Sequence, residues 1–304
     1  MRRLSICIPT YKRLSKAIEL ALFLRKHFNE KAVEILVVLD ASDDVLTAER
    51  EQRLRFDKVN VIRHGKNLGY EAAFLSCLSY AKSEYVLICP DDDTLVPEAI
   101  SELIQYINFS DEDIIVFDWI GISGKKMRNY SEITGLRLQD IRDAVNHATG
   151  IVYKRSDLIA KYELIRSNNS YSSLRFYYPQ VFFALLVYLS GGSILTKNLV
   201  LGGYSKFGPE PSDLMDERGL SYCHPASSLS TWIDLIDFLQ DSLNSFHVTA
   251  SQKKELRQYI RHLKYLLFTS VYSSIESKES YNDSSVILGI LRAFVSAFLN
   301  KLRR

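Results

Sequence analysis

The sequence predicts an α/β protein with a mostly parallel central sheet and an α-helical C-terminal region. Short apolar runs alternate with amphipathic segments through the first hundred residues. The apolar runs are hydrophobic at consecutive positions, which is typical of strands in a parallel sheet covered on both faces. Beyond residue 225 only helical periodicity remains. We therefore expect one α/β domain over 1–224, with halves at 1–107 and 108–224, and a helical region over 225–304.

The expected strands are short runs of mostly apolar residues, and the expected helices repeat apolar residues every three or four positions. We expect strands at 4–8, 33–39, 59–63, 85–89, 113–119, 150–153 and 193–201. We expect helices at 16–28, 45–54, 70–81, 97–107, 156–165, 179–189, 228–246, 251–274 and 284–304. Residues 121–149 are polar and irregular, and we expect a hairpin and a short helix there.

The composition excludes several classes of protein. Hydrophobic residues make up 47% and charged residues 24% of the 304 residues, which is enough for a large core. The formal charge of +2 argues against binding nucleic acid through the whole surface, and we expect no nucleic-acid partner. Cys7, Cys77, Cys89 and Cys223 lack the spacing of zinc ligands. No signal peptide or long apolar run is present, so we expect a cytoplasmic location.

Three consecutive aspartates, Asp91, Asp92 and Asp93, follow the expected strand at 85–89. Ligands bind at the carboxyl ends of strands in sheets of this kind. Adjacent carboxylates repel one another, and a divalent cation such as Mg²⁺ or Mn²⁺ relieves the repulsion. The alternative is a solvated loop before a helix, where Asp is also favoured. The position after a buried strand favours the cation.

Several common motifs are missing from the sequence. It has no G-x-x-x-x-G-K-[ST] loop and no G-x-G-x-x-G after the first strand. Kinases and ordinary dinucleotide dehydrogenases lose their support for this reason. It also has no G-x-S-x-G, which argues against a serine hydrolase of the α/β type.

Four segments at strand ends together resemble a known family. They are Ser5–Arg13 (SICIPTYKR), Glu34–Asp44 (EILVVLDASDD), Asn67–Gly69 (NLG) and Tyr85–Asp93 (YVLICPDDD). In this order they resemble a family-two glycosyltransferase with the GT-A fold. The resemblance is strong over 3–107, weaker to 205 and absent beyond. It implies transfer of a sugar, with inversion, from a nucleotide-diphosphate sugar to a hydroxyl of a glycan or lipid-linked acceptor.

The resemblance also implies roles for matching residues. The metal ligands would be Asp91, Asp92 and Asp93, holding Mg²⁺ or Mn²⁺ against the leaving diphosphate. Asp40 would contact the uracil or ribose, and Arg63 the base or pyrophosphate. The remaining nucleotide-binding candidates are Pro9, Thr10, Tyr11, Arg13, Asn67 and Asp91. Their alternatives are ordinary surface residues and, for Asn67, a turn before a helix.

Two departures from the family pattern concern the acidic motifs. When the aspartate motif is aligned on Pro97, its usual first carboxylate falls on Pro90, so Asp92 is the first choice as metal ligand and Asp93 the second. At the end of the second strand, only Asp40 remains of the usual acidic pair.

A third departure concerns the catalytic base, which an inverting enzyme needs for the acceptor hydroxyl. The family commonly supplies it from a Glu-Asp pair at the start of a helix, which here reads Tyr177-Tyr178-Pro179-Gln180. The base is therefore not assigned. Its candidates, each with the alternative of being a surface acid, are Asp118, Glu210, Asp213, Asp216 and Glu217.

The C-terminal segment at 286–304 is amphipathic and carries basic residues and no acid. It fits an anionic membrane surface, or a last helix packed on its neighbours. A polyprenyl-linked acceptor of surface polysaccharide synthesis, as for O-antigen or capsule, would give it a peripheral place on the cytoplasmic face of the inner membrane. Two other functions stay open: a glycosyltransferase-like subunit that binds without transfer, and a nucleotidyltransferase of sugar-nucleotide metabolism.

Overall fold

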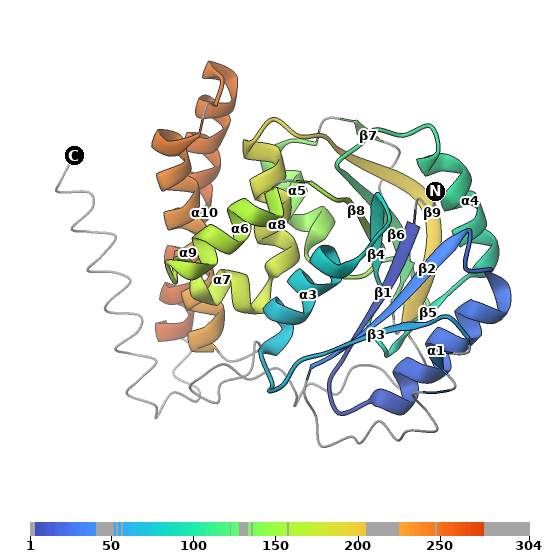
Figure 1. The fold of residues 1–304 in the computed structure, drawn as a ribbon. Coiled ribbons are helices and arrows are strands. Elements are labelled where there is room, and N and C mark those ends of the chain that lie inside the picture. Colours follow the sequence, from blue (N-terminus) through green and yellow to red (C-terminus); the bar gives the residue numbers. More distant parts are fainter. Residues whose placement is uncertain are drawn as a thin grey trace. The chain divides into compact units, whose positions relative to one another are not determined.

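In the computed structural model the chain forms two compact units, and Figure 1 labels the helices and strands. The first unit spans Met1–Asn168 and Tyr178–Glu210, and the second spans Asn169–Tyr177 and Pro211–Arg304. The expected division of the chain at residue 224 stays a prediction. The residues that the structure describes are 4–40, 52, 54–55, 57–121, 123–127, 133–134, 136–156, 158–204, 225–246 and 248–276.

The first unit alternates strands and helices. Its strands are β1 (Leu4–Thr10), β2 (Val33–Leu39), β3 (Asn60–Arg63), β4 (Tyr85–Ile88), β5 (Asp93–Leu95), β6 (Ile114–Ile120), β7 (Ile133–Thr134), β8 (Ile151–Lys154) and β9 (Ile194–Tyr204). Its helices are α1 (Leu14–His27), α3 (Gly69–Tyr80), α4 (Pro97–Ile107), α5 (Leu138–Val145), α6 (Leu158–Ser167) and α8 (Pro179–Leu189).

All of these strands belong to one sheet, in the order β3-β2-β1-β4-β8-β6-β9-β5, with β7 paired to β9. The pairs β1–β2, β1–β4, β2–β3 and β6–β9 are parallel. The pairs β4–β8, β6–β8, β5–β9 and β7–β9 are antiparallel. The predicted α/β class and helical C-terminal part are confirmed. The sheet is parallel through β4 but mixed beyond it, because later strands return along a neighbour instead of crossing over.

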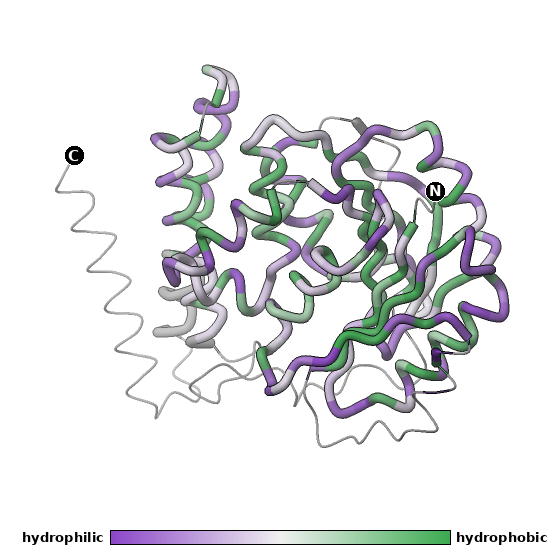
Figure 2. The backbone as a smooth tube through the Cα atoms, in the orientation of Figure 1, coloured by the Kyte–Doolittle hydropathy of each residue, from purple (hydrophilic) through white to green (hydrophobic). Residues whose placement is uncertain are grey.

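The central strands are buried because helices cover both faces of the sheet (Figure 1). Every residue of β1, β2 and β4 is buried. On one face, Ala17 of α1 and Ile100 of α4 share a core with Ile6. On the other face, the rings of Phe74, Tyr153 and Phe183 meet edge to face at 5.5–6.2 Å. Figure 2 shows the hydrophobic residues concentrated along these strands.

Most expected elements are present, with two additions. Asp93 begins a short strand, β5, where we expected only the turn before α4, and α7 (Ser172–Tyr177) was not expected. Both are too short to show a periodicity in the sequence. The expected helix at 45–54 falls mostly, and that at 284–304 entirely, outside the described residues. Among the helices described, none is long and apolar enough to cross a membrane.

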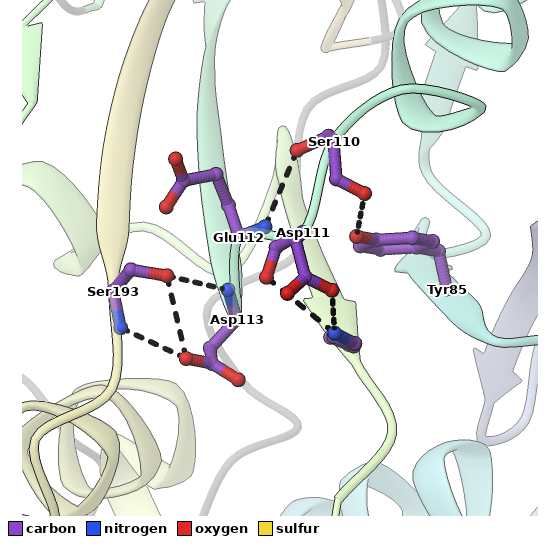
Figure 3. Close-up of polar contacts among 7 residues, drawn as sticks. Tyr85, Ser110, Asp111, Glu112, Asp113 and Ser193 are labelled. Atoms are coloured by element: carbon purple, nitrogen blue, oxygen red, sulfur yellow. Dashed lines mark hydrogen bonds and ion pairs between the residues drawn. The ribbon is translucent and has the colours of Figure 1, made fainter.

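A group of polar contacts fixes the edge of the sheet where β4 begins (Figure 3). The carboxylate of Asp113, just before β6, accepts hydrogen bonds from the backbone N–H of Ser193 at 2.8 Å and from its hydroxyl at 3.3 Å. The Tyr85 hydroxyl donates to the Ser110 carbonyl at 2.9 Å, and Lys154 pairs with Asp111. The contacts of Asp113 and Tyr85 hold the starts of β4, β6 and β9 together, so the carboxyl ends of β1–β4 lie at the opposite end of the strands.

Gly202 allows β5 to pack against β9 beside Trp119. A Cβ at this position would lie 2.0 Å from the Thr94 carbonyl oxygen and 2.8 Å from the Trp119 ring. Leu95 pairs with Gly202 in the sheet, so a side chain here would push β5 away from β9. The position of β5, and of Asp93 at its start, therefore depends on this glycine.

We predict that Gly202→Ala lowers the free energy of unfolding by about 3 kcal/mol, because the added methyl group overpacks the sheet. Urea unfolding of the purified variant measures this. The matched control is Gly65→Ala, since a Cβ at Gly65 meets no atom within 4 Å. Equal midpoints for the two variants would contradict the prediction.

The second unit contains α7, α9 (Pro225–Ser245) and α10 (Ala250–Glu276). The Asp234 carboxylate of α9 accepts hydrogen bonds from the first backbone N–H groups of α7, at Ser173 (2.7 Å) and Leu174 (3.1 Å). The Tyr171 hydroxyl donates to Asp241 at 2.7 Å. Burial raises the pKa of Asp237 between these two acids, and the charges of Asp234 and Asp241 raise it further.

We predict that Asp237→Asn stabilises the protein at pH 7 and not at pH 3. The pKa of Asp237 is higher in the folded state than its ordinary value. The stability that comes from keeping Asp237 protonated in the folded state is therefore complete below the unfolded pKa and is lost as the pH rises through the folded pKa. At pH 7 the buried charge of Asp237 destabilises the folded state, and asparagine removes this charge. Chemical denaturation of wild type and variant at both pH values measures this. An identical difference at the two pH values would contradict it.

Candidate functional site

The candidate site lies at the carboxyl ends of β1 and β4. β1 leads to β2 and β3 on one side, whereas β4 lies on its other side, so the strand order reverses between β1 and β4. Ligands of open α/β sheets bind at such a switch point, outside the carboxyl ends of the strands. The residues that follow β1 and β4 are Tyr11–Arg13 and Asp91–Asp93.

Side chains from these two strand ends are joined directly. The Thr10 hydroxyl donates to Asp91 Oδ2 at 2.5 Å. The Arg13 guanidinium bridges two carboxylates: Nη2 lies 2.8 Å from Asp91 Oδ1 and Nη1 lies 3.1 Å from Asp92 Oδ2. The side chain of Asp91 is fully buried and that of Asp92 is 6% exposed, whereas Arg13 is 25% exposed. Thr10, Arg13, Asp91 and Asp92 thus form one polar cluster.

Asp93 faces the interior. Neither of its carboxylate oxygens has a hydrogen-bond partner, and both are buried. The Tyr70 hydroxyl and the Trp119 indole nitrogen are also buried and without a hydrogen-bond partner. Burial raises the pKa of Tyr70 and the charge of Asp93 adds to this rise, whereas the Trp119 side chain acts to lower the pKa of Asp93. Asp93 therefore keeps buried carboxylate oxygens without a hydrogen bond inside the site.

Burial governs the ionisation of these aspartates. Burial raises the pKa of Asp91 to about 6, although Arg13 and the Thr10 hydroxyl act to lower it. Burial raises the pKa of Asp93 well above its ordinary value, and the charges of Asp92 and Asp91 add to this rise. Burial therefore disfavours the ionised forms of Asp91 and Asp93.

The aspartate turn, Asp91–Asp93, offers the type of ligand that a divalent cation prefers, but its carboxylates do not converge as the ligands of a metal site do. Mg²⁺ and Mn²⁺ prefer carboxylate oxygens, and two unpartnered oxygens stand at Asp93. In the part of the chain that the structure describes, no three His, Cys, Asp or Glu side chains converge as metal ligands. Asp91 and Asp92 are turned toward Arg13 instead. The roles of Asp91, Asp92 and Asp93 as metal ligands stay a prediction.

Asp40, at the end of β2, holds the start of α3. Its Oδ1 accepts from the backbone N–H of Leu68 at 2.8 Å, and its Oδ2 accepts from that of Gly69 at 2.7 Å. A ring nitrogen of His64 lies 2.9 Å from Oδ1, and the other ring nitrogen lies 2.8 Å from the Ser76 hydroxyl. Asp40 is 3% exposed. The predicted contact of Asp40 with a nucleotide stays a prediction, and these contacts give it a structural role as well.

Other predicted nucleotide-binding residues lie at the same edge. Pro9 is buried within β1, and Tyr11 is half-buried just after it. Arg63 is exposed at the last position of β3. The Asn67 side chain accepts from the backbone N–H of Gly69 at 2.9 Å, and Gly69 has a φ of 81°. Asn67 therefore takes part in the turn before α3, and its predicted contact with a nucleotide stays a prediction.

The candidate bases give no assignment. Asp118 is buried, and its Oδ2 accepts from Lys126 Nζ at 2.9 Å. Gln180, at the start of α8, donates from Nε2 to the Asn146 carbonyl at 3.0 Å. Both side chains therefore already hold a structural partner. The other candidates, Glu210, Asp213, Asp216 and Glu217, lie outside the described residues.

Sequence reasoning missed the partners of the aspartates. Tyr70 and Trp119 beside Asp93, and His64 beside Asp40, were not singled out. His64 directly follows Arg63 at a strand end, so its position was the available signal. Tyr70 and Trp119 lie within a helix and a strand whose patterns only indicate packing, and no sequence signal marked them.

The fold and this site define an α/β protein with a candidate ligand site, rich in buried carboxylate side chains, at a topological switch point. Comparison with known proteins identifies the class further. A model of glycosyl transferase family 2 matches residues 5–161, more than half of the chain. The chain belongs to glycosyl transferase family 2.

Solved structures agree with the GT-A fold. A fragment of S. aureus TarS in complex with UDP-GlcNAc is 16% identical, with a TM-score of 0.66 over 97% of this chain and 81% of that chain. The same fragment without that ligand gives 15% identity and a TM-score of 0.64 over 96% and 80% of the two chains. The mannosyltransferase PcManGT from Pyrobaculum calidifontis, with GDP-Man and Mn²⁺, gives 14% and 0.50 over 98% and 81%.

We predict that Asp40→Ala lowers the free energy of unfolding by about 2 kcal/mol, because two backbone N–H groups at the start of α3 lose their acceptor. Thermal and urea unfolding measure this. Asp111→Ala is the matched control, since the Asp111 side chain is 95% exposed and its ion pair is expected to contribute little. The prediction fails if both variants unfold like the wild type.

Proposed function

We propose that this protein transfers a sugar from a nucleotide-diphosphate sugar to a hydroxyl of a glycan or lipid-linked acceptor. The observation that carries the proposal is the cluster of Thr10, Arg13, Asp91 and Asp92 at the switch point of the sheet. A diphosphate needs counter-charge as it leaves, and acidic residues at this position provide ligands for a cation that supplies it.

The chemistry bound by structural relatives supports the donor class. TarS from S. aureus has been solved with UDP-GlcNAc and with UDP, and PcManGT with GDP-Man and Mn²⁺. The three organic ligands, UDP-GlcNAc, UDP and GDP-Man, each contain a nucleoside diphosphate. We extend this class, a nucleoside diphosphate carrying a hexose, to the present chain.

Each residue of the site has a proposed part. Asp92, with Asp91 and Asp93, would hold Mg²⁺ or Mn²⁺, which when bound neutralises charge on the diphosphate. Arg13 supplies a permanent positive charge at the start of α1, and Thr10 orients Asp91 through its hydrogen bond. The nucleoside would lie toward the ends of β2 and β3, where Pro9, Tyr11, Asp40, Arg63 and Asn67 line the edge.

We propose an inverting transfer, in which the acceptor hydroxyl loses its proton to a carboxylate of this chain. The basic segment at 286–304 supports an acceptor on a membrane surface, such as a polyprenyl-linked glycan of surface polysaccharide synthesis, and a peripheral cytoplasmic location. This segment lies outside the described residues.

A binding subunit without transfer is the second candidate. The observation in its favour is Gln180, which starts α8 where the family commonly has an acid and which is 3% exposed. An amide cannot accept a proton as a general base. Under this hypothesis the protein binds a sugar nucleotide at the switch point and does not turn it over.

The test is calorimetric titration of UDP and GDP, with and without Mn²⁺, on wild type and Asp92→Asn. We expect binding that Mn²⁺ strengthens, and at least a tenfold weaker affinity in the variant with Mn²⁺ present, because a ligand is lost. Unchanged binding in the variant would remove the assignment of Asp92.

Hydrolysis of UDP-GlcNAc or GDP-Man, followed by release of the nucleoside diphosphate, separates the two functions. Slow turnover by the wild type contradicts the binding subunit. Tight binding of both donors without turnover, in the presence of Mn²⁺ and of glycan and lipid-linked acceptors, contradicts the transferase.

A further inference from the structure

Arg13 occupies the oxygens that a cation at the aspartate turn would need. Its two terminal nitrogens contact Asp91 Oδ1 and Asp92 Oδ2, one carboxylate each. This two-pronged contact uses the planar fork of a guanidinium. Within the described residues, these are the ion pairs that the turn makes. The guanidinium therefore stands as a resident counter-ion.

Among the three carboxylates of the turn, Arg13 pairs with those of Asp91 and Asp92. One guanidinium faces three consecutive carboxylates, and Asp93 has no hydrogen-bond partner. Coulomb attraction at such short distances in a partly buried site is strong, so a doubly charged cation would be favoured over a single positive charge. Arg13 is the most exposed member of the cluster at 25% and is the one with room to move.

We propose that Arg13 exchanges partners: it neutralises Asp91 and Asp92 while the site is free, and it gives them up to a divalent cation and turns to the diphosphate of the donor. This inference rests on the proposed function, since it assumes that a cation and a diphosphate bind here. It assigns one side chain two successive roles, counter-ion and then anion ligand.

The position of Arg13 in the fold supports the second role. Arg13 directly precedes α1, and no acidic residue occupies the first turn of this helix. The positive end of a helix dipole favours anions, and a diphosphate binding at the switch point would lie beside it. A guanidinium released from Asp91 and Asp92 would remain within the same few residues and could pair with two phosphate oxygens.

The test measures Mn²⁺ binding to the nucleotide-free protein by electron paramagnetic resonance, on wild type, Arg13→Gln and Arg13→Lys. We expect Arg13→Gln to bind Mn²⁺ about tenfold more tightly, because the competing charge is gone. With Mn²⁺ saturating, we expect its affinity for UDP to fall about tenfold, because an anion ligand is lost. Arg13→Lys keeps the charge, and its Mn²⁺ affinity should stay near that of the wild type.

Controls keep this result distinct from the proposed function. Arg137→Gln is the matched substitution, since Arg137 pairs with Asp140 on the exposed surface of α5. Retained Mn²⁺ binding in Asp92→Asn would move the cation away from this turn and so overturn the metal assignment. Equal or weaker Mn²⁺ binding in Arg13→Gln, beside normal loss in Asp92→Asn, overturns only the exchange by Arg13.

A second measurement avoids dependence on the folding of Arg13→Gln, which leaves Asp91 buried without its partner. Arginine side-chain N–H resonances of the wild type are recorded with ¹⁵N labelling, and Arg13 is assigned from its loss in Arg13→Lys. We expect Mg²⁺ to shift the Arg13 resonance and UDP to shift it again. No shift with saturating Mg²⁺ overturns the inference.

Discussion

The structure depends on how three buried carboxylates are accommodated at the end of one strand. Asp91, Asp92 and Asp93 follow one another at the end of β4, and all are nearly buried. Burying ionised carboxylates is costly unless they are paired and hydrogen-bonded. Thr10 and Arg13 from the end of β1 supply a hydroxyl and a guanidinium. These contacts form only if β1 and β4 are neighbours in the sheet. The order of the strands and the contacts of the site therefore depend on each other.

The remaining architecture holds these strand ends in place. Contacts of Asp113 and Tyr85 fix the far end of the sheet, and Gly202 brings β5 against β9 so that Asp93 turns inward. Asp40 uses its buried carboxylate to attach α3 to the end of β2. Acidic residues at this end of the sheet thus differ in their contacts: Asp40 holds backbone N–H groups of α3, whereas the carboxylate oxygens of Asp93 have no hydrogen bond.

Most strands and helices of the first hundred residues could be predicted because each one has a recognisable local sequence pattern. β1, β2 and β4 are runs of apolar residues, α4 begins at Pro97, and the aspartates stand directly after a strand. The strands beyond β4 pair partly antiparallel, and this could not be predicted, since a short apolar run carries no direction. For the same reason β5, with three residues, was not expected.

The sequence by itself determined the class of fold, the family and the edge of the sheet on which polar residues gather, because hydrophobic periodicity and motif order are local properties of the chain. Only the tertiary structure decided which polar groups meet. Arg13 and Asp92 are 79 positions apart, and Asp40 reaches Gly69 across 29. Trp119 and Tyr70 join Asp93 from two further elements. Such pairings follow from strand order, twist and packing, and these arise only when the whole sheet is assembled.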